Sequence, residues 1–195
     1  MIRLKKIIKL YENDSYLREC SADVVSIEDF NGQPAVVLNR TVFHPQGGGQ
    51  PGDRGIIVCD DRQVDVLDTR RDEDGIVYHI VSSTDGLQEG SDVMCQLDWG
   101  FRYPHMVSHT AEHVLFRSLY LETDGAISVE KIRLSGFGGK IFIGGEIPDF
   151  DTIYRALMRA NNIIRENRVV NIIFVPKEHV KKKYPDFQRA FAELE

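Results

Sequence analysis

The sequence has no long apolar run. None of its apolar stretches approaches the roughly 20 residues that a membrane-spanning helix needs. In the N-terminal segment the longest apolar run is Ile7-Ile8, which is too short for the core of a secretory signal peptide. We therefore expect a cytoplasmic protein that has no membrane partner.

Cysteine is scarce and the signatures of several enzyme classes are missing. The chain has three cysteines, Cys20, Cys59 and Cys95, widely spaced and without a CxxC pair, so we expect free and buried thiols rather than a disulfide framework. A GxSxG elbow is absent, which argues against a serine hydrolase of that type. A glycine loop followed by Lys-Ser or Lys-Thr is also absent, so the chain carries no phosphate-binding loop of the Walker kind.

The net charge of −6 is unevenly distributed. Residues 1–98 carry 10 basic against 18 acidic side chains, whereas residues 99–195 carry 14 against 12. A polyanionic partner would therefore prefer the second half, near Arg155, Arg159, Arg165, Arg168 and residues 177–183. The alternative is that these charges only solvate helix faces.

Residues 22–98 have the pattern of an all-β unit. Short β-branched stretches recur at regular intervals, which is typical of a small barrel or sandwich. Turn signals separate the stretches, namely Asn31-Gly32, Asp60-Asp61, Asp74-Gly75 and Asp85-Gly86.

After residue 98 the pattern becomes mixed, and the fold class that we predict is α+β. We expect a barrel domain at 1–98 and an α+β domain at 99–195. Spacings of three and four predict a helix over 101–121 that has Pro104 in its first turn. The further predicted elements are strands at 126–133 and 140–143, a helix at 151–167 capped by Asp149 or Asp151, a strand at 169–175 and a short helix at 187–194.

Three histidines, His105, His109 and His113, recur at a spacing of four within the predicted helix. Side chains four residues apart lie on one helix face, about 6 Å apart at Cβ, and two imidazoles can then bind one metal ion. Glu112 precedes His113, whereas in the HExxH zinc proteases the glutamate follows the first histidine, so this is a different motif. The alternative is a set of surface or core histidines without a metal.

A glycine-rich segment runs from Phe43 to Gly55 as FHPQGGGQPGDRG. Three consecutive glycines between prolines exclude regular structure and allow a ligand or another backbone to approach closely. Such a loop can reach into a neighbouring site or hold an anion. The alternative is a tight turn of the barrel.

Together, HPQGGGQPGDRG and, some 55 residues later, SHTAEHVLF resemble the editing module of alanyl-tRNA synthetase and its stand-alone relatives, the AlaX proteins. The resemblance covers essentially the whole chain and favours the medium-length class. It implies a small barrel with the glycine loop, followed by an α+β domain of the type found in threonyl- and alanyl-tRNA synthetase editing. It also implies hydrolysis of mischarged tRNA in trans, with serine or glycine wrongly attached to the acceptor end of the alanine tRNA.

Carried over position by position, the resemblance gives His109 and His113 as ligands of Zn²⁺. It gives Gly47, Gly48, Gly49, Gln50 and Thr110 as the substrate-binding residues, and Thr110 and Gln50 as the catalytic candidates.

One element of the family pattern is missing. These relatives complete the zinc site with a CxxxH element, and the present sequence has no cysteine after Cys95. The expected site is then half complete, because a typical zinc site has at least three protein ligands. Either the chain ends before that element, or this member has lost half of the site. Two alternative functions also stay open: a non-catalytic homologue that binds tRNA or a synthetase, and a metal-binding protein unrelated to tRNA.

Overall fold

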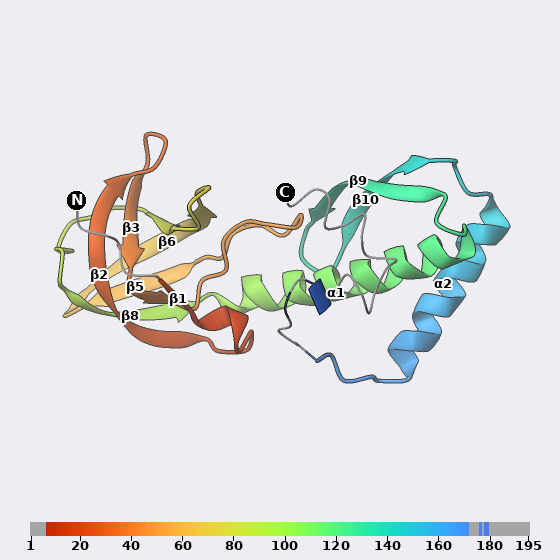
Figure 1. Ribbon diagram of the computed structural model, residues 1–195. Helices are drawn as coiled ribbons and strands as arrows, with labels where there is room; N and C mark the ends of the chain where they lie inside the picture. The colour runs from red at the N-terminus through yellow and green to blue at the C-terminus, as the bar shows by residue number, and fades with distance from the viewer. Residues whose placement is uncertain (1–6, 172–175, 177, 180–195) are drawn as a thin grey trace. The chain divides into compact units, whose positions relative to one another are not determined.

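Six strands close into a barrel in the order β2-β3-β7-β6-β5-β8 in the computed structural model, which describes residues 7–171, 176, 178 and 179 (Figure 1). Buried and exposed residues alternate along β2, β6 and β8, as expected where one face of a strand lines a core and the other meets water. The six strands are β2 (Glu19–Asp29), β3 (Pro34–Leu38), β5 (Gly55–Cys59), β6 (Arg62–Arg71), β7 (Val77–Val81) and β8 (Asp92–Leu97). A small barrel is therefore confirmed.

The barrel interior is a packed apolar core rather than a channel. Phe43, Leu38 and Ile57 are its largest fully buried side chains. At the turn between β2 and β3, Asn31 and Gly32 both have positive φ, the conformation that a two-residue hairpin turn requires. Beside the barrel, β1 (Ile8–Lys9) pairs in parallel with β4 (Arg40–Thr41), and the short 3₁₀ helix η1 (Leu10–Glu12) follows β1.

Helix α1 (Trp99–Glu122) follows the last barrel strand. Asp98 caps it, since its side chain accepts a hydrogen bond from the Phe101 amide at 3.0 Å. The helix therefore begins two residues earlier than the sequence pattern indicates. The expectation that Pro104 lies in the first turn is wrong, because this residue is inside the helix.

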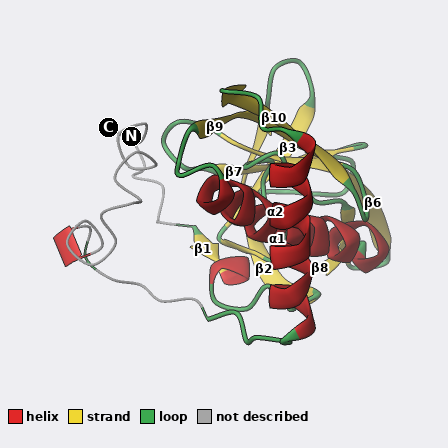
Figure 2. Ribbon diagram, turned by 90° about the vertical axis from the view of Figure 1, so that its right-hand side faces the viewer, coloured by secondary structure: helices red, strands yellow, loops and turns green. Residues whose placement is uncertain are grey.

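An antiparallel hairpin and a second helix complete the described fold. The hairpin consists of β9 (Ile127–Leu134) and β10 (Gly139–Gly145), and the Asp149 carboxylate caps α2 (Phe150–Arg165) by accepting from the Thr152 amide at 2.7 Å. Figure 2 distinguishes the red helices from the yellow strands of this α+β fold, and the fold class is confirmed. Neither described helix is long and apolar enough to cross a membrane.

The chain divides into two units, residues 1–160 and 161–195, and the first contains the barrel, α1 and the hairpin. The predicted domain boundary at residue 98 stays a prediction. Residues 169–171 are not in a strand, contrary to expectation, since their backbone has no strand partner among the described residues. Residues 172–175 and the expected helix at 187–194 lie outside the described residues.

Candidate functional site

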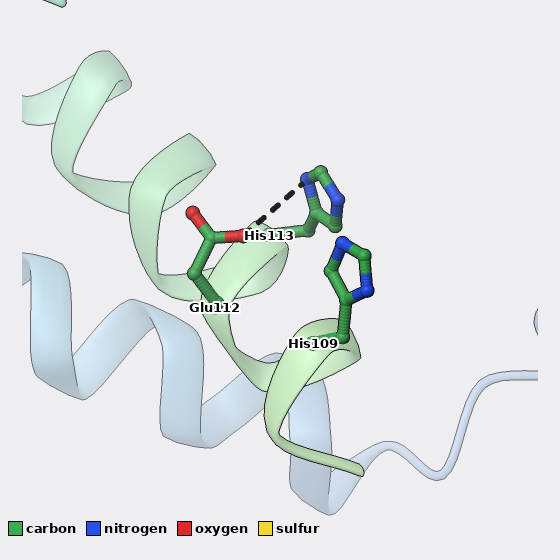
Figure 3. Close-up of side chains that lie close together, drawn as sticks. All are labelled: His109, Glu112 and His113. Atoms are coloured by element: carbon green, nitrogen blue, oxygen red, sulfur yellow. Dashed lines mark ion pairs between the residues drawn. The ribbon is translucent and has the colours of Figure 1, made fainter. Parts of the chain in front are cut away.

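Two imidazoles lie together on one face of α1. The ring centroids of His109 and His113 are 5.0 Å apart, and the ring planes are inclined by 17° (Figure 3). A spacing of four residues in a helix produces this arrangement. The side chain of His113 is 70% exposed, whereas His109 is half-buried, so the pair opens to solvent on one side.

Glu112 joins the two histidines as a third potential ligand. One ligand atom each from His109, Glu112 and His113 lie within 4.8 Å of one another (Figure 3). Glu112 is only 6% exposed, and its Oε2 has no hydrogen-bond partner, although His113 Nδ1 lies 3.8 Å away. Burial raises the pKa of this carboxyl group, and the neighbouring His113 opposes the increase. A buried oxygen without a donor beside two imidazoles suits a cation.

Sequence reasoning noted Glu112 only as a departure from the HExxH pattern. The signal that could have identified it is its position three residues after His109 and one before His113. Residues three apart on a helix are neighbours, so the carboxylate can reach the same point as the two rings.

Gln50 positions the first imidazole from the barrel side. The Gln50 Oε1 atom accepts a hydrogen bond from His109 Nδ1 at 3.0 Å, and Gln50 is buried. With the proton on Nδ1, the lone pair of His109 is on Nε2, as a metal ligand requires. Burial, and then the nearby His113, lower the pKa of His109.

The glycine loop approaches the same ring. Reciprocal hydrogen bonds between the backbones of Gly47 and Gln50, at 2.9 and 3.1 Å, close a tight turn. Gly48 has φ +56°, and a Cβ atom at this position would lie 3.0 Å from His109 Cε1. The absence of a side chain thus allows the loop to lie against His109.

The other side of the loop contacts the β9–β10 hairpin. The Gly49 carbonyl accepts a hydrogen bond from the Leu134 amide at 3.0 Å. A Cβ atom on Gly49 would come within 2.6 Å of Ile132 Cγ2. The loop therefore contacts both the histidine helix and the hairpin.

A buried ion pair joins the end of the glycine motif to α1. Arg102 donates to the Asp53 carboxylate, and both residues are at most 2% exposed. The same carboxylate accepts from the His44 amide. Burial raises the pKa of Asp53 to about 6, against the lowering effect of Arg102. Sequence reasoning missed this pair, because nothing in the pattern indicates that residues 49 positions apart meet.

His105, the first histidine of the series, has a structural role. Its Nδ1 donates to the Phe101 carbonyl at 2.6 Å, and its Nε2 accepts from the Gly136 amide at 3.0 Å. Ser108 also donates to the Gly136 carbonyl, at 2.6 Å. These bonds hold the hairpin tip against α1 and leave His105 without a free ligand nitrogen.

Thr110 lies on the exposed surface of α1, and its hydroxyl donates to the Met106 carbonyl at 3.2 Å. A mainly apolar cavity of about 420 Å³ lies between α1, the hairpin and α2, and Glu112 is one of its few polar wall residues. Neither Thr110 nor the glycine loop lines this cavity. The structure therefore groups Gly48, Gln50 and His109 with His113, and leaves Thr110 beside them on the open helix face.

Comparison with known proteins agrees with these features. Residues 5–101 match the family model described as tRNA synthetases class II (A). The AlaX-M alanyl-tRNA editing protein of Methanosarcina acetivorans is 33% identical over 181 residues, which cover 89% of this chain and 71% of that protein.

Other relatives are longer. The AlaX-L alanyl-tRNA editing protein of Pyrococcus horikoshii is 38% identical over 161 residues, covering 80% of this chain and 38% of its own length. The alanine–tRNA ligase of Pyrococcus furiosus is 32% identical over 183 residues, covering 90% of this chain and 19% of the ligase. The matched region thus spans less than half of the length of these two relatives. The identity and coverage of the AlaX-M relative show that the chain belongs to the AlaX family of alanyl-tRNA editing proteins.

Proposed function

We propose that this protein hydrolyses, in trans, the ester bond between a wrongly attached serine or glycine and the 3′ end of the alanine tRNA. The observation that carries the proposal is the cluster of His109, Glu112 and His113, with Gly48 against one of its rings. Family membership supports the same reaction. A second hydrolytic site is needed because a synthetase pocket rejects an analogue with one added hydroxyl only weakly.

Zn²⁺ is the proposed metal, held by His109, His113 and Glu112. The fit is supported by the buried Glu112 Oε2, which has no hydrogen-bond partner, and by the hydrogen bond from His109 Nδ1 to Gln50, which leaves His109 Nε2 available. Three protein ligands with an open side are typical of catalytic rather than structural zinc sites. When bound, zinc would polarise the ester carbonyl, lower the pKa of a water molecule, or anchor the substrate amino group.

The protein's own groups have positioning roles in this proposal. Gln50 fixes the tautomer and orientation of His109 through the Nδ1 hydrogen bond. Gly47, Gly48 and Gly49 let the substrate come close to the rings, because no side chain projects from the loop. Thr110 offers a hydroxyl on the open face of α1, where the amino acid and the terminal ribose would lie.

A second candidate is a non-catalytic homologue that binds tRNA or a synthetase. The cluster itself favours it, because among the described residues it offers two imidazoles and depends on Glu112 for a third ligand. The two candidates differ in zinc content and in the turnover of seryl-tRNA. Cytoplasmic location remains a prediction in both cases.

The proposal is tested by measuring bound zinc and the hydrolysis of seryl-tRNA for the alanine tRNA. His109→Ala and His113→Ala should each lose the metal and the activity. Val107→Ala, which shortens an exposed side chain of α1 that is not in the cluster, should retain both. Unchanged seryl-tRNA turnover in the first two variants would rule out this mechanism, and zinc binding without turnover in the unmodified protein would favour the non-catalytic candidate.

A further inference from the structure

Four aromatic rings from three separate segments form a continuous series, which we call the aromatic ladder. It consists of Tyr16, Trp99, Tyr103 and Phe137. Successive ring centroids are 5.7, 5.4 and 6.4 Å apart, and the central pair, Trp99 and Tyr103, is stacked at an inclination of 29°. These separations are within the range of favourable aromatic pairs.

The ladder is open to solvent at both ends. Tyr16 is 63% exposed and Phe137 is 73% exposed, while Tyr103 is partly exposed between them. The guanidinium of Arg18 lies 4.4 Å from the centroid of the Trp99 ring, and Arg18 is itself exposed. Exposed rings beside an arginine combine a stacking surface with a positive charge, the pairing that single-stranded nucleic acids prefer.

The ladder is continuous with the candidate site along α1. Trp99, Tyr103, Met106, Thr110 and His113 follow one another at spacings of three and four, so they share one helix face. At a rise of about 1.5 Å per residue, Tyr103 and His113 are separated by about 15 Å along the axis. This length corresponds to about four nucleotides at about 3.4 Å each. Phe137 is the last ring of the ladder, after Tyr103. The hydrogen bonds of His105 and Ser108 to Gly136 hold in place the tip of the β9–β10 hairpin, which carries Phe137.

We propose that the aromatic ladder is a stacking platform for the unpaired nucleotides at the 3′ end of the tRNA. The inference rests on the proposed function. It means that the acceptor end of the tRNA reaches the histidines along α1, from the Trp99 end. Arg18 would contact the phosphate backbone while bases stack on Tyr16, Tyr103 and Phe137.

The arginines of α2 are less suited to this role. Arg155 and Arg159 share one carboxylate, Glu122, at 3.1 and 2.7 Å, so one of their two charges is compensated within the protein. RNA that bound to these arginines of α2 would not meet a series of rings that leads to the candidate site. The ladder therefore explains recognition of an unpaired end better than the basic residues of α2.

The test uses Trp99, which is the only tryptophan of the chain and therefore reports on the ladder alone. An RNA stem-loop that carries no amino acid and ends in a single-stranded ACCA 3′ overhang is titrated into the full chain. The tryptophan fluorescence is recorded during the titration. The same stem-loop without its overhang is the comparison. We expect the overhang to quench Trp99 and the blunt stem-loop to leave its emission unchanged.

Variants of the exposed rings make the test specific. Tyr16→Leu and Tyr103→Leu keep an apolar side chain but remove the ring, and each should weaken overhang binding about 10-fold or more. Tyr16→Phe keeps the ring and should bind like the unmodified protein. Phe150→Leu removes a ring that is 78% exposed on α2 and outside the ladder, and it should also bind normally. Circular dichroism and thermal unfolding establish that each variant is folded.

Three outcomes would overturn the platform: equal quenching by both stem-loops, unchanged affinity in both leucine variants, or a Trp99 emission that changes with protein concentration without RNA. The last outcome would identify the ladder as a contact between protein copies. Because the RNA carries no amino acid, the result is independent of hydrolysis. Overhang binding without seryl-tRNA turnover would contradict the proposed function and leave the platform standing.

Discussion

Gly48 is the position at which one missing side chain matters most for the candidate site. Its φ is positive, and an added Cβ atom would meet His109 at 3.0 Å from Cε1 and 3.1 Å from Nε2. Gly48→Ala should therefore displace the imidazole and lower both the zinc affinity and the rate of seryl-tRNA hydrolysis, each by about 10-fold or more. A chelator competition assay and a deacylation assay measure the two effects.

The neighbouring glycine provides a matched control. At Gly47, a Cβ atom would meet nothing closer than the Pro45 carbonyl at 3.9 Å, and its φ is not in the left-handed region. Gly47→Ala should keep the zinc affinity, and metal binding is the readout compared here because Gly47 is itself one of the proposed substrate-binding residues. Equal losses in the two variants would show that the loop as a whole, rather than the contact with His109, controls the site.

A second prediction, at Gln50, separates the orientation of the His109 ring from the binding of the metal by its ligands. Gln50→Leu removes the acceptor of the His109 Nδ1 proton but none of the proposed ligands. Loss of such a partner typically lowers metal affinity by about 10- to 100-fold. The same chelator assay measures the change, and an affinity equal to that of the unmodified protein would exclude the positioning role of Gln50.

The histidines show why single residues were only partly predictable. Spacing alone placed His105, His109 and His113 on one helix face, and it cannot distinguish a ligand from a structural histidine. The distinction comes from Gly136, which lies at the tip of the β9–β10 hairpin. The amide of Gly136 donates a hydrogen bond to His105 Nε2, so this nitrogen cannot bind a metal. Glu112 was overlooked for a related reason: its missing hydrogen-bond partner is a property of the folded surroundings.

The ion pair between Asp53 and Arg102 connects two elements, the glycine loop and α1. Removing one partner of a buried pair leaves an uncompensated charge, which costs about 3–5 kcal/mol. Arg102→Met should therefore lower the free energy of unfolding by about this amount. The double variant with Asp53→Asn should regain part of it, because both charges are then removed. Urea denaturation measures both effects.

An exposed pair serves as the control for this effect. Arg168 pairs with Glu166 at the surface, where an ion pair contributes at most about 1 kcal/mol. Arg168→Met should accordingly change the unfolding free energy little. If Arg102→Met were equally harmless, the pair would not anchor the glycine loop to α1.

Local patterns predicted most of the secondary structure. Recurring short β-branched stretches indicated the barrel strands, and Asp149 was correctly named among the possible caps of α2. The start of α1 was misplaced because Pro104 suggested a first turn, whereas the Asp98 cap begins the helix at Trp99. The strand order of the barrel and the Asp53–Arg102 pair were not predicted, since both depend on contacts between distant parts of the chain.

Several ionisable groups lie inside the folded protein, and they link its stability to pH. His79 is fully buried: its Nδ1 donates to the Val36 carbonyl at 2.8 Å, and its Nε2 lies 2.8 Å from Thr41 Oγ1. Burial lowers the pKa of His79 to about 4 and that of His44 also to about 4. Asp53 acts in the opposite direction, because burial raises its pKa to about 6.

The expected pH dependence follows from these directions. A histidine whose pKa is lowered by folding contributes stability that is present above its ordinary pKa of 6.5 and is lost as the pH falls towards 4. Asp53 has the opposite effect: its carboxyl group binds a proton more tightly in the folded than in the unfolded protein, so it raises the free energy of unfolding as the pH falls from about 6 to about 4. The two histidines outweigh the one carboxyl group, so the unfolding free energy should decrease from pH 7 to pH 4.

His79→Gln tests one of the two histidine contributions. A lowering of the pKa from 6.5 to about 4 corresponds to about 3.5 kcal/mol, at about 1.4 kcal/mol for each pKa unit. The variant should lose stability at pH 7, where the native hydrogen bonds of His79 are intact. Between pH 6.5 and 4, the free energy of unfolding of the variant should decrease less than that of the unmodified protein, by about this amount. Urea denaturation at a series of pH values measures both curves, and parallel curves would mean that protonation of His79 does not contribute to the acid sensitivity of the fold.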